Sequence, residues 1–80
     1  MKIKVRYFGK LTDLTDKNEE VLNLEKRSSL SELELILYQR YPGIQKAHYI
    51  VFRNSTLLSD KTMLLKDSDD ISIMPPFSGG

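Results

Sequence analysis

Polar and apolar residues alternate near the start of the chain, from residue 2 to residue 8. Alternate side chains of an extended segment point to opposite faces, so this pattern predicts a β-strand. One face of the strand carries Ile3, Val5 and Tyr7. The other face carries Lys4, Arg6 and Phe8. We expect the first of these faces to lie in the core.

Two further segments precede the first long helical pattern. Residues 9–17 place Leu11 and Leu14 among threonines and aspartates, which predicts a connection with about one helical turn. Residues 18–24 put Leu22 and Leu24 on the same face of a second strand. We expect this strand to form a hairpin with the first one.

A helix is expected to begin after Ser29. Ser29 and Glu32 form a capping box, in which each side chain accepts a hydrogen bond from the backbone N–H of the other residue. An apolar stripe at helical spacing follows, made of Leu30, Leu33, Ile36, Leu37 and Tyr41. Glu34 is expected to lie away from this stripe. Pro42 and Gly43 are expected to end the helix, because proline disfavours a helical conformation in the residue before it.

The second half of the chain predicts three strands. Residues 48–53 are rich in β-branched and aromatic residues, residues 54–55 form a turn, and residues 56–58 return as a short strand. After a second turn at residues 67–69, Ile71 and Ile73 share one face of a last strand over residues 70–74. These elements predict an α+β domain over residues 1–74, in which one main helix covers a mixed or antiparallel sheet.

The composition is that of one ordinary globular domain. The 80 residues are 40% hydrophobic and 29% charged, so a second core would not fit. Twelve basic against eleven acidic residues give no electrostatic footprint for nucleic acid. The chain has no cysteine, which excludes disulfides and a cysteine nucleophile. We also predict no signal peptide and no membrane anchor, and therefore a cytoplasmic protein.

No metal site is expected. His48 has no second histidine or cysteine at ligand spacing, and is interpreted as a histidine at a strand edge. Asp67, Asp69 and Asp70 lack the length and the glycine of a calcium loop, and are interpreted as a solvated turn.

The last six residues, 75–80, are expected to form a flexible extended tail. Pro75 and Pro76 stop the strand, because proline cannot donate to the ladder, and they stiffen the base of the tail. Gly79 and Gly80 lack Cβ atoms, so a carboxylate on Gly80 has the thin approach that a narrow active site requires. Once adenylated, such a carboxylate becomes an acyl electrophile that sulfide or a persulfide converts to a thiocarboxylate.

The end of the sequence, LKDSDDISIMPPFSGG over residues 65–80, resembles the end of the small subunits of molybdopterin synthases. These sulfur carriers have a Leu-x-Asp-Gly-Asp-Glu-Val turn and strand that lead into Pro-Pro-x-x-Gly-Gly. The resemblance extends more weakly over the whole chain and implies a ubiquitin-like β-grasp fold. Ser68 stands where the family turn usually has glycine, and Asp70 replaces the usual glutamate.

The resemblance implies a sulfur carrier without catalytic side chains of its own, acting in molybdenum cofactor biosynthesis. An adenylyltransferase of the ubiquitin-activating type would use ATP to adenylate Gly80, and a sulfurtransferase would supply the sulfur. The tail, made of Pro75, Pro76, Phe77, Ser78 and Gly79, would enter the large synthase subunit. There the thiocarboxylate would donate sulfur for the dithiolene of molybdopterin, within a heterotetramer. The carrier itself would bind no cofactor.

Three apolar side chains are predicted to form a docking surface beside the tail. The alternation that buries Tyr7 and Ile73 turns Phe8 and Met74 to the opposite face of the sheet. Leu57, on the short strand, is expected to join them. The alternative is that all three are scattered exposed hydrophobic residues, as on any protein.

Three other functions remain open from the sequence. A carrier of the thiamine pathway shares the fold and the Gly-Gly end but typically lacks the two prolines before it. A protein modifier would conjugate Gly80 to lysines of target proteins, as ubiquitin does. A plain interaction module would not need Gly79 and Gly80 at all.

Overall fold

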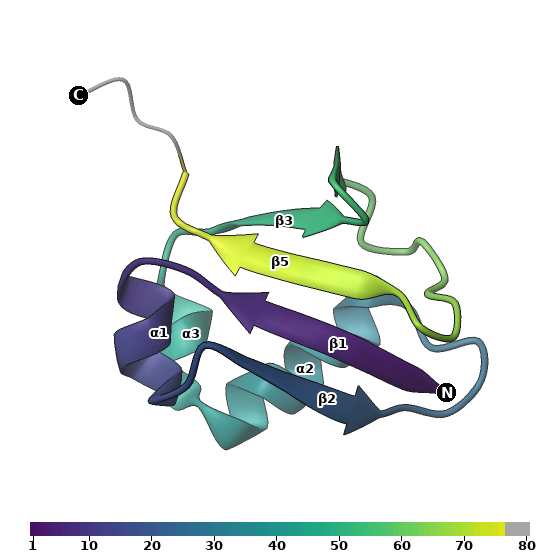
Figure 1. Ribbon diagram of the computed structural model, residues 1–80, viewed down its shortest axis with the longest axis horizontal. Helices are drawn as coiled ribbons and strands as arrows, with labels where there is room; N and C mark the ends of the chain where they lie inside the picture. The colour runs from purple at the N-terminus through teal and green to yellow at the C-terminus, as the bar shows by residue number, and fades with distance from the viewer. Residues whose placement is uncertain (77–80) are drawn as a thin grey trace.

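The computed structural model describes residues 1–76 and contains a single sheet with helices on one side (Figure 1). In chain order the elements are β1 (Lys2–Tyr7), α1 (Lys10–Thr15), β2 (Glu19–Asn23), α2 (Leu30–Arg40), α3 (Pro42–Lys46), β3 (Ile50–Arg53), β4 (Thr56–Leu57) and β5 (Asp70–Met74). Every strand predicted from the sequence is present. No helix in this part of the chain has the length and apolar character needed to cross a membrane.

The sheet has the strand order β2-β1-β5-β3-β4 and is mixed. The first and last strands, β1 and β5, are parallel neighbours at its centre, whereas β1–β2, β5–β3 and β3–β4 are antiparallel pairs. The three helices lie on one face of this sheet, and the opposite face is open (Figure 1). This arrangement confirms the α+β class and the ubiquitin-like β-grasp fold, with α2 as the main helix.

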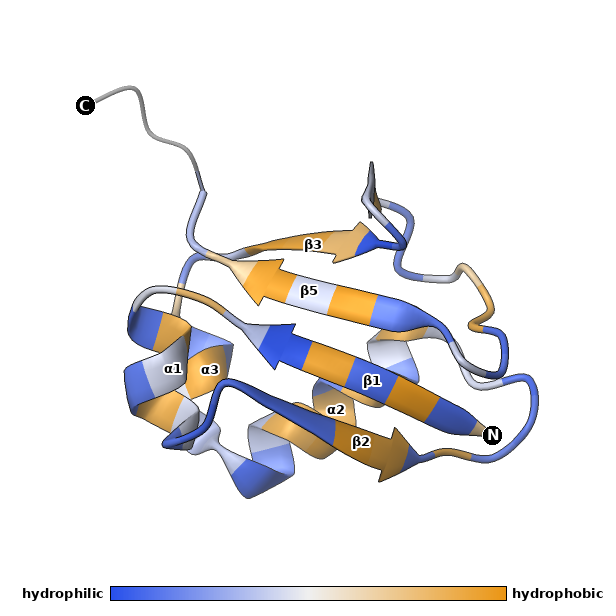
Figure 2. Ribbon diagram, viewed as in Figure 1, coloured by the Kyte–Doolittle hydropathy of each residue, from blue (hydrophilic) through white to orange (hydrophobic). Residues whose placement is uncertain are grey.

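The core lies between the sheet and α2, and the alternation along the strands produces it. Apolar and polar residues alternate along β1 and β5 (Figure 2), and their inward side chains are almost inaccessible to solvent. The most deeply buried residues are Ile3, Val5, Leu11, Leu30, Leu33, Leu37, Ile44, Ile71 and Ile73. Burial of this kind contributes about 1.5–3 kcal/mol for each large aliphatic side chain.

The main helix begins as the sequence predicts but is followed by a second helix. The Ser29 hydroxyl accepts from the Glu32 N–H at 3.3 Å, and the Glu32 carboxylate accepts from the Ser29 N–H at 3.2 Å. The main helix ends at Arg40, before Pro42, as expected, but a second helix directly after it was not expected. Tyr41 leaves helical geometry at φ −134°, and Pro42 then opens α3, because the first position of a helix does not need an N–H donor.

In the acidic turn before β5, Asp67 is exposed as expected, but Asp69 is buried, which corrects the interpretation of the whole turn as solvated. Asp69 is only 5% exposed and accepts from the Lys66 N–H at 2.8 Å and the Asn54 side-chain amide at 3.0 Å. Arg53 Nε lies 3.0 Å from the same carboxylate. Asp69 therefore joins the β3–β4 turn to the start of β5, and each of these hydrogen bonds stabilises the fold.

Candidate functional site

The candidate site lies where β5 ends and the chain leaves the sheet. Phe8, the residue after β1, donates its backbone N–H to the Ile73 carbonyl at 3.1 Å. This is the last backbone hydrogen bond between the β1 segment and β5. Beyond Met74, Pro75 and Pro76 have no N–H to continue the ladder. Pro75 is half-buried against the domain and Pro76 is exposed. The chain therefore leaves the sheet at the end of a central strand, beside the corner between β1 and α1 (Figure 1).

The other predicted tail residues, Phe77, Ser78, Gly79 and Gly80, lie outside the described residues. Their proposed roles therefore stay predictions.

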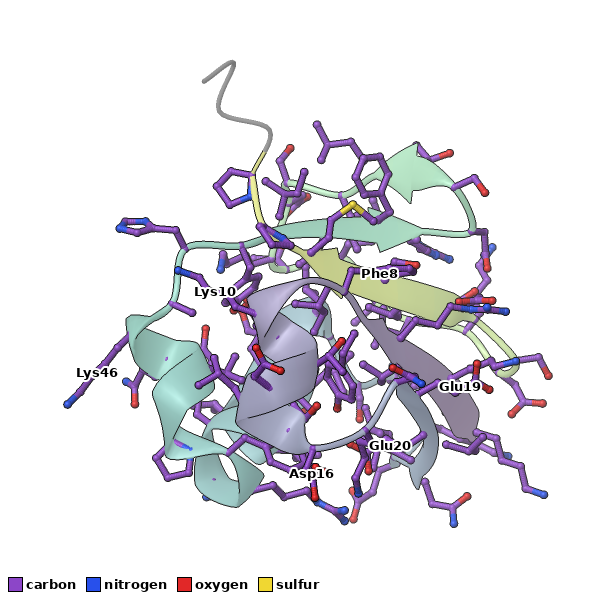
Figure 3. All side chains as sticks on the ribbon, turned by 60° about the vertical axis from the view of Figure 1, so that its left-hand side comes forward. Phe8, Lys10, Asp16, Glu19, Glu20 and Lys46 are labelled. Carbon is purple, nitrogen blue, oxygen red and sulfur yellow. The ribbon has the colours of Figure 1, made fainter. Side chains whose placement is uncertain are left out.

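The three residues predicted to form a docking surface all lie on the open face of the sheet. Phe8 is 43% exposed and Leu57 is 58% exposed, while Met74 is half-buried. Phe8 lies at the point where the chain passes from β1 towards α1 (Figure 3). Met74 belongs to β5, immediately before the two prolines. The structure thus places Phe8 and Met74 beside the base of the tail, and Leu57 on the edge strand β4, which β3 separates from β5.

Two further apolar residues, missed from the sequence, belong to the same face. Ile50 is the cross-strand partner of Met74, and Phe52 is the partner of Leu57. Directly opposed residues point to the same side of a sheet, and Val51 between them is buried in the core. The alternation of inward and outward side chains along β3 could have identified Ile50 and Phe52 from the sequence. We call the five residues Phe8, Ile50, Phe52, Leu57 and Met74 the apolar patch.

Charged side chains border the apolar patch on the β1 side. Arg6 Nε lies 3.0 Å from both carboxylate oxygens of Asp70, and this hydrogen bond raises the pKa of the Arg6 guanidinium. Lys4 Nζ lies 3.3 Å from the Glu19 carboxylate. A shallow groove on the open face runs between the two regions and is lined by Arg6, Phe8, Phe52, Asp70 and Met74 among others. The surface thus combines an apolar centre with a charged border, as protein interfaces do.

Residues 1–76 contain no group of three or more histidine, cysteine, aspartate or glutamate side chains that could hold a metal ion. His48 is exposed and precedes β3. Asp70 is held by Arg6, and Asp67 accepts from the Lys2 N–H at 2.7 Å. The described residues of the site therefore form a surface next to the point where the tail leaves the sheet.

Proteins similar to this chain in sequence include named sulfur carriers. The chain is 26% identical over 82 residues to the molybdopterin synthase sulfur carrier subunit of Homo sapiens, across 98% of this chain and 93% of that protein. The putative molybdopterin converting factor subunit 1 from Pyrococcus furiosus superposes with a TM-score of 0.88 at 22% identity, covering 95% of this chain and 98% of that one. The latter likeness concerns the fold.

Two other solved structures are more similar in sequence. Subunits 1 and 2 of the molybdopterin-converting factor from Helicobacter pylori form a protein–protein complex, and the matching chain has a TM-score of 0.74 and 29% identity over 100% of both chains. The small archaeal modifier protein 1 of Methanosarcina acetivorans has a TM-score of 0.80 and 28% identity, over 99% of this chain and 96% of that one. The model of the ThiS family matches residues 5–80. Because this match covers all but the first four residues, the chain belongs to the ThiS family.

Proposed function

We propose that the protein is the sulfur carrier subunit of a molybdopterin synthase. The observation that carries this proposal is the run Pro-Pro-Phe-Ser-Gly-Gly placed directly after β5, within a family match that extends to residue 80. The curated relatives, such as the human protein described above, bear the name of this subunit. The open apolar patch around the base of the tail fits a carrier that must dock onto other proteins.

In this proposal Gly80 is the group that reacts. Its carboxylate attacks the α-phosphate of ATP on an activating enzyme, which forms the acyl adenylate and releases pyrophosphate. Sulfide then attacks the acyl carbon and AMP leaves, so that one carboxylate oxygen is replaced by sulfur. Where the donor is a persulfide, a thiol cleaves the resulting acyl disulfide and releases the same thiocarboxylate. The thiocarboxylate sulfur finally attacks a carbon of the pterin precursor and displaces an oxygen substituent from it. Water then hydrolyses the resulting thioester, so that the sulfur stays on the pterin and the carboxylate is regenerated.

The remaining residues of the tail allow Gly80 to reach the active site of the partner. Gly79 has no side chain, so the reactive end fits a narrow channel. Pro75, Pro76, Phe77 and Ser78 are the segment that passes through the partner. The catalytic side chains belong to the large subunit, the carrier binds no cofactor of its own, and ATP is used by the activating enzyme. We place this chemistry in the cytoplasm, in a heterotetramer with two carriers at its ends.

The large subunit and the activating enzyme dock on the apolar patch. The Helicobacter pylori structure, a complex of subunits 1 and 2, supports a partner of the large-subunit kind. The patch joins both central and edge strands, so a partner that covers it also covers the point where the tail leaves the sheet. A sulfurtransferase supplies the sulfur.

Intact mass spectrometry tests the carrier chemistry. The protein is incubated with ATP, the activating enzyme of its own host and a sulfur source. We expect a mass gain equal to the replacement of one oxygen by sulfur, and no gain in a variant that lacks Gly80. If the wild-type chain gains no mass and ATP is not consumed, the carrier proposal is wrong.

A protein modifier is the second candidate function, because the chain is similar to the small archaeal modifier protein 1 of Methanosarcina acetivorans. The first step, adenylation of Gly80, is common to both functions, but a modifier forms isopeptide bonds with lysines. Adducts of the chain on other proteins in a host lysate, resistant to thiol reduction and absent from the variant without Gly80, would support this function. A thiamine-type carrier is the remaining alternative. It predicts that the thiocarboxylate form donates sulfur to a thiazole synthase instead of to the large synthase subunit.

A further inference from the structure

The corner between β1 and α1 lies directly beneath the base of the tail. Gly9 occupies this corner with φ +57° and ψ −136°, a backbone conformation that residues with a Cβ rarely adopt. Its carbonyl accepts from the Thr12 N–H at 3.0 Å, and the Thr12 hydroxyl donates to the Tyr7 carbonyl at 3.1 Å. These bonds hold the backbone of Gly9 in one position.

Pro75 packs against this glycine. A Cβ built on Gly9 would lie 2.8 Å from Cγ of Pro75, closer than real Cβ atoms come to such a neighbour, and 3.2 Å from its Cδ, which is closer than in most real contacts. The proline ring is rigid and sits at the first position after β5. The ring therefore cannot move aside as the tip of a flexible side chain would, and a side chain at residue 9 forces the base of the tail and the β1–α1 corner apart.

From this contact we propose that Gly9 is a positioning residue for the tail. The absence of a side chain at residue 9 lets Pro75 sit on the β1–α1 corner, which fixes the direction in which the C-terminal residues leave the sheet. Two contacts then define the exit: the Phe8 N–H bond to the Ile73 carbonyl, and the Pro75 ring on Gly9. This inference rests on the proposed function, since direction matters only if the tail must enter a partner.

A small change at the root of the tail has a large effect at its end. Inside a channel of a partner that holds them extended, the five residues beyond Pro75 would span at most about 17 Å. A swing of about 10° at the root therefore moves a terminal group by about 3 Å over that length. Misplacement of a reacting group by about 1 Å can already slow a reaction roughly a hundredfold.

The test separates docking from transfer. The thiocarboxylate form of the full chain is mixed with the large synthase subunit of the same host, and two quantities are measured: the docking Kd and the single-turnover rate of sulfur transfer. We expect Gly9→Ala to leave the Kd within about twofold and to slow transfer roughly ten- to hundredfold. Gly43→Ala is the matched control, because its Cβ would also lie 2.8 Å from a neighbour, but that neighbour is the movable Cδ2 of Leu14 and not an atom of the tail. We expect its transfer rate to be that of the wild type.

A double variant distinguishes the contact from simple strain in the backbone. Pro75→Ala removes the ring atoms that the new Cβ would strike, but leaves the unfavourable φ at residue 9. If the contact matters, Gly9→Ala slows transfer much less in the P75A background than in the wild type, because the two substitutions act through one interaction. Equal slowing in both backgrounds, or no slowing in either, would overturn the proposal.

A nuclear Overhauser measurement on the unmodified wild-type chain tests the contact without any partner or reaction, and it decides the question if Gly9→Ala does not fold. We expect cross-peaks between the Pro75 ring protons and the Gly9 α-protons. Their absence overturns the positioning role. If the cross-peaks are present but the wild-type chain carries no sulfur, the proposed function has failed and not the contact.

Discussion

Lys61 Nζ lies 2.8 Å from Oε2 of Glu34, and this ion pair joins the loop before β5 to the main helix. Glu34 is only 4% exposed, although it is a charged residue on α2. Its carboxylate also accepts from the hydroxyl of Tyr49, and that hydroxyl lies 2.5 Å from the Tyr38 hydroxyl. A buried carboxylate is tolerated only with such partners, so these four residues act as one structural cluster.

Replacement of Glu34 is expected to destabilise the protein strongly. Glu34→Gln leaves Lys61 without its partner and the tyrosine hydroxyls with a weaker acceptor, so we expect the free energy of unfolding to fall by about 2–3 kcal/mol. Urea denaturation measures this change. Glu25→Gln is the control at an exposed position, with an expected change within about 0.5 kcal/mol. Equal stability of the two variants would contradict the structural role of the cluster.

The same cluster predicts a loss of stability in alkali. Burial of Tyr49, together with its hydrogen bond to Glu34, raises the pKa of its hydroxyl above the ordinary value of 10.0. Above that pH the unfolded chain has released this proton while the folded chain keeps it, so the free energy of unfolding falls as the pH rises. The pKa of Lys61, raised by Glu34, acts in the same direction.

Urea denaturation at several pH values between about 8 and 11 checks this pH dependence. In Tyr49→Phe the decline in stability should be shallower than in the wild type, because one of the titrating groups is gone. A decline of the same slope in both proteins would assign the alkaline loss to other groups.

The sequence predicted the strands and the main helix because their local patterns are strong. The alternation in β1 and β5 involves only residues that are close together in the sequence. The same is true of the capping box at Ser29. Glu34 was different. The expectation that Glu34 lies away from the apolar stripe was wrong, because it follows Leu30 by four residues and precedes Leu37 by three, and the structure buries it with them. Its main partner, Lys61, is 27 residues away, and no local pattern identifies such a pair.

The candidate site likewise has a part that local sequence patterns predicted and a part that they did not. The outward direction of Phe8 and Met74 followed from alternation, and the structure places both on the open face. The contact of Gly9 with Pro75 joins two ends of the sequence through the parallel pairing of β1 and β5. Only the fold brings those residues together. Proline is equally ambiguous from sequence, since Pro42 fits both the end of one helix and the first position of the next.

Ser68 offers a stabilising substitution. The residue has φ +68°, the left-handed conformation in which a Cβ is unfavourable. We expect Ser68→Gly to raise the free energy of unfolding by about 1 kcal/mol, because glycine adopts this conformation without strain. Ser59→Gly is the control, since the φ of Ser59 is not positive and glycine should there only increase the entropy of the unfolded chain. Urea denaturation should therefore give changes of opposite sign for the two variants.

Substitutions in the apolar patch are expected to weaken docking without unfolding the protein. Leu57→Gln removes an exposed apolar side chain of the apolar patch, and Leu35→Gln removes an equally exposed one on α2, with exposed fractions of 58% and 60%. Titration calorimetry with the large synthase subunit should give a Kd roughly tenfold weaker for Leu57→Gln and unchanged for Leu35→Gln. The free energy of unfolding of both variants should lie within about 0.5 kcal/mol of the wild-type value, because neither side chain is in the core. Equal affinities for all three proteins would mean that partners approach the tail from another side, and that the open face of the sheet is not their docking surface.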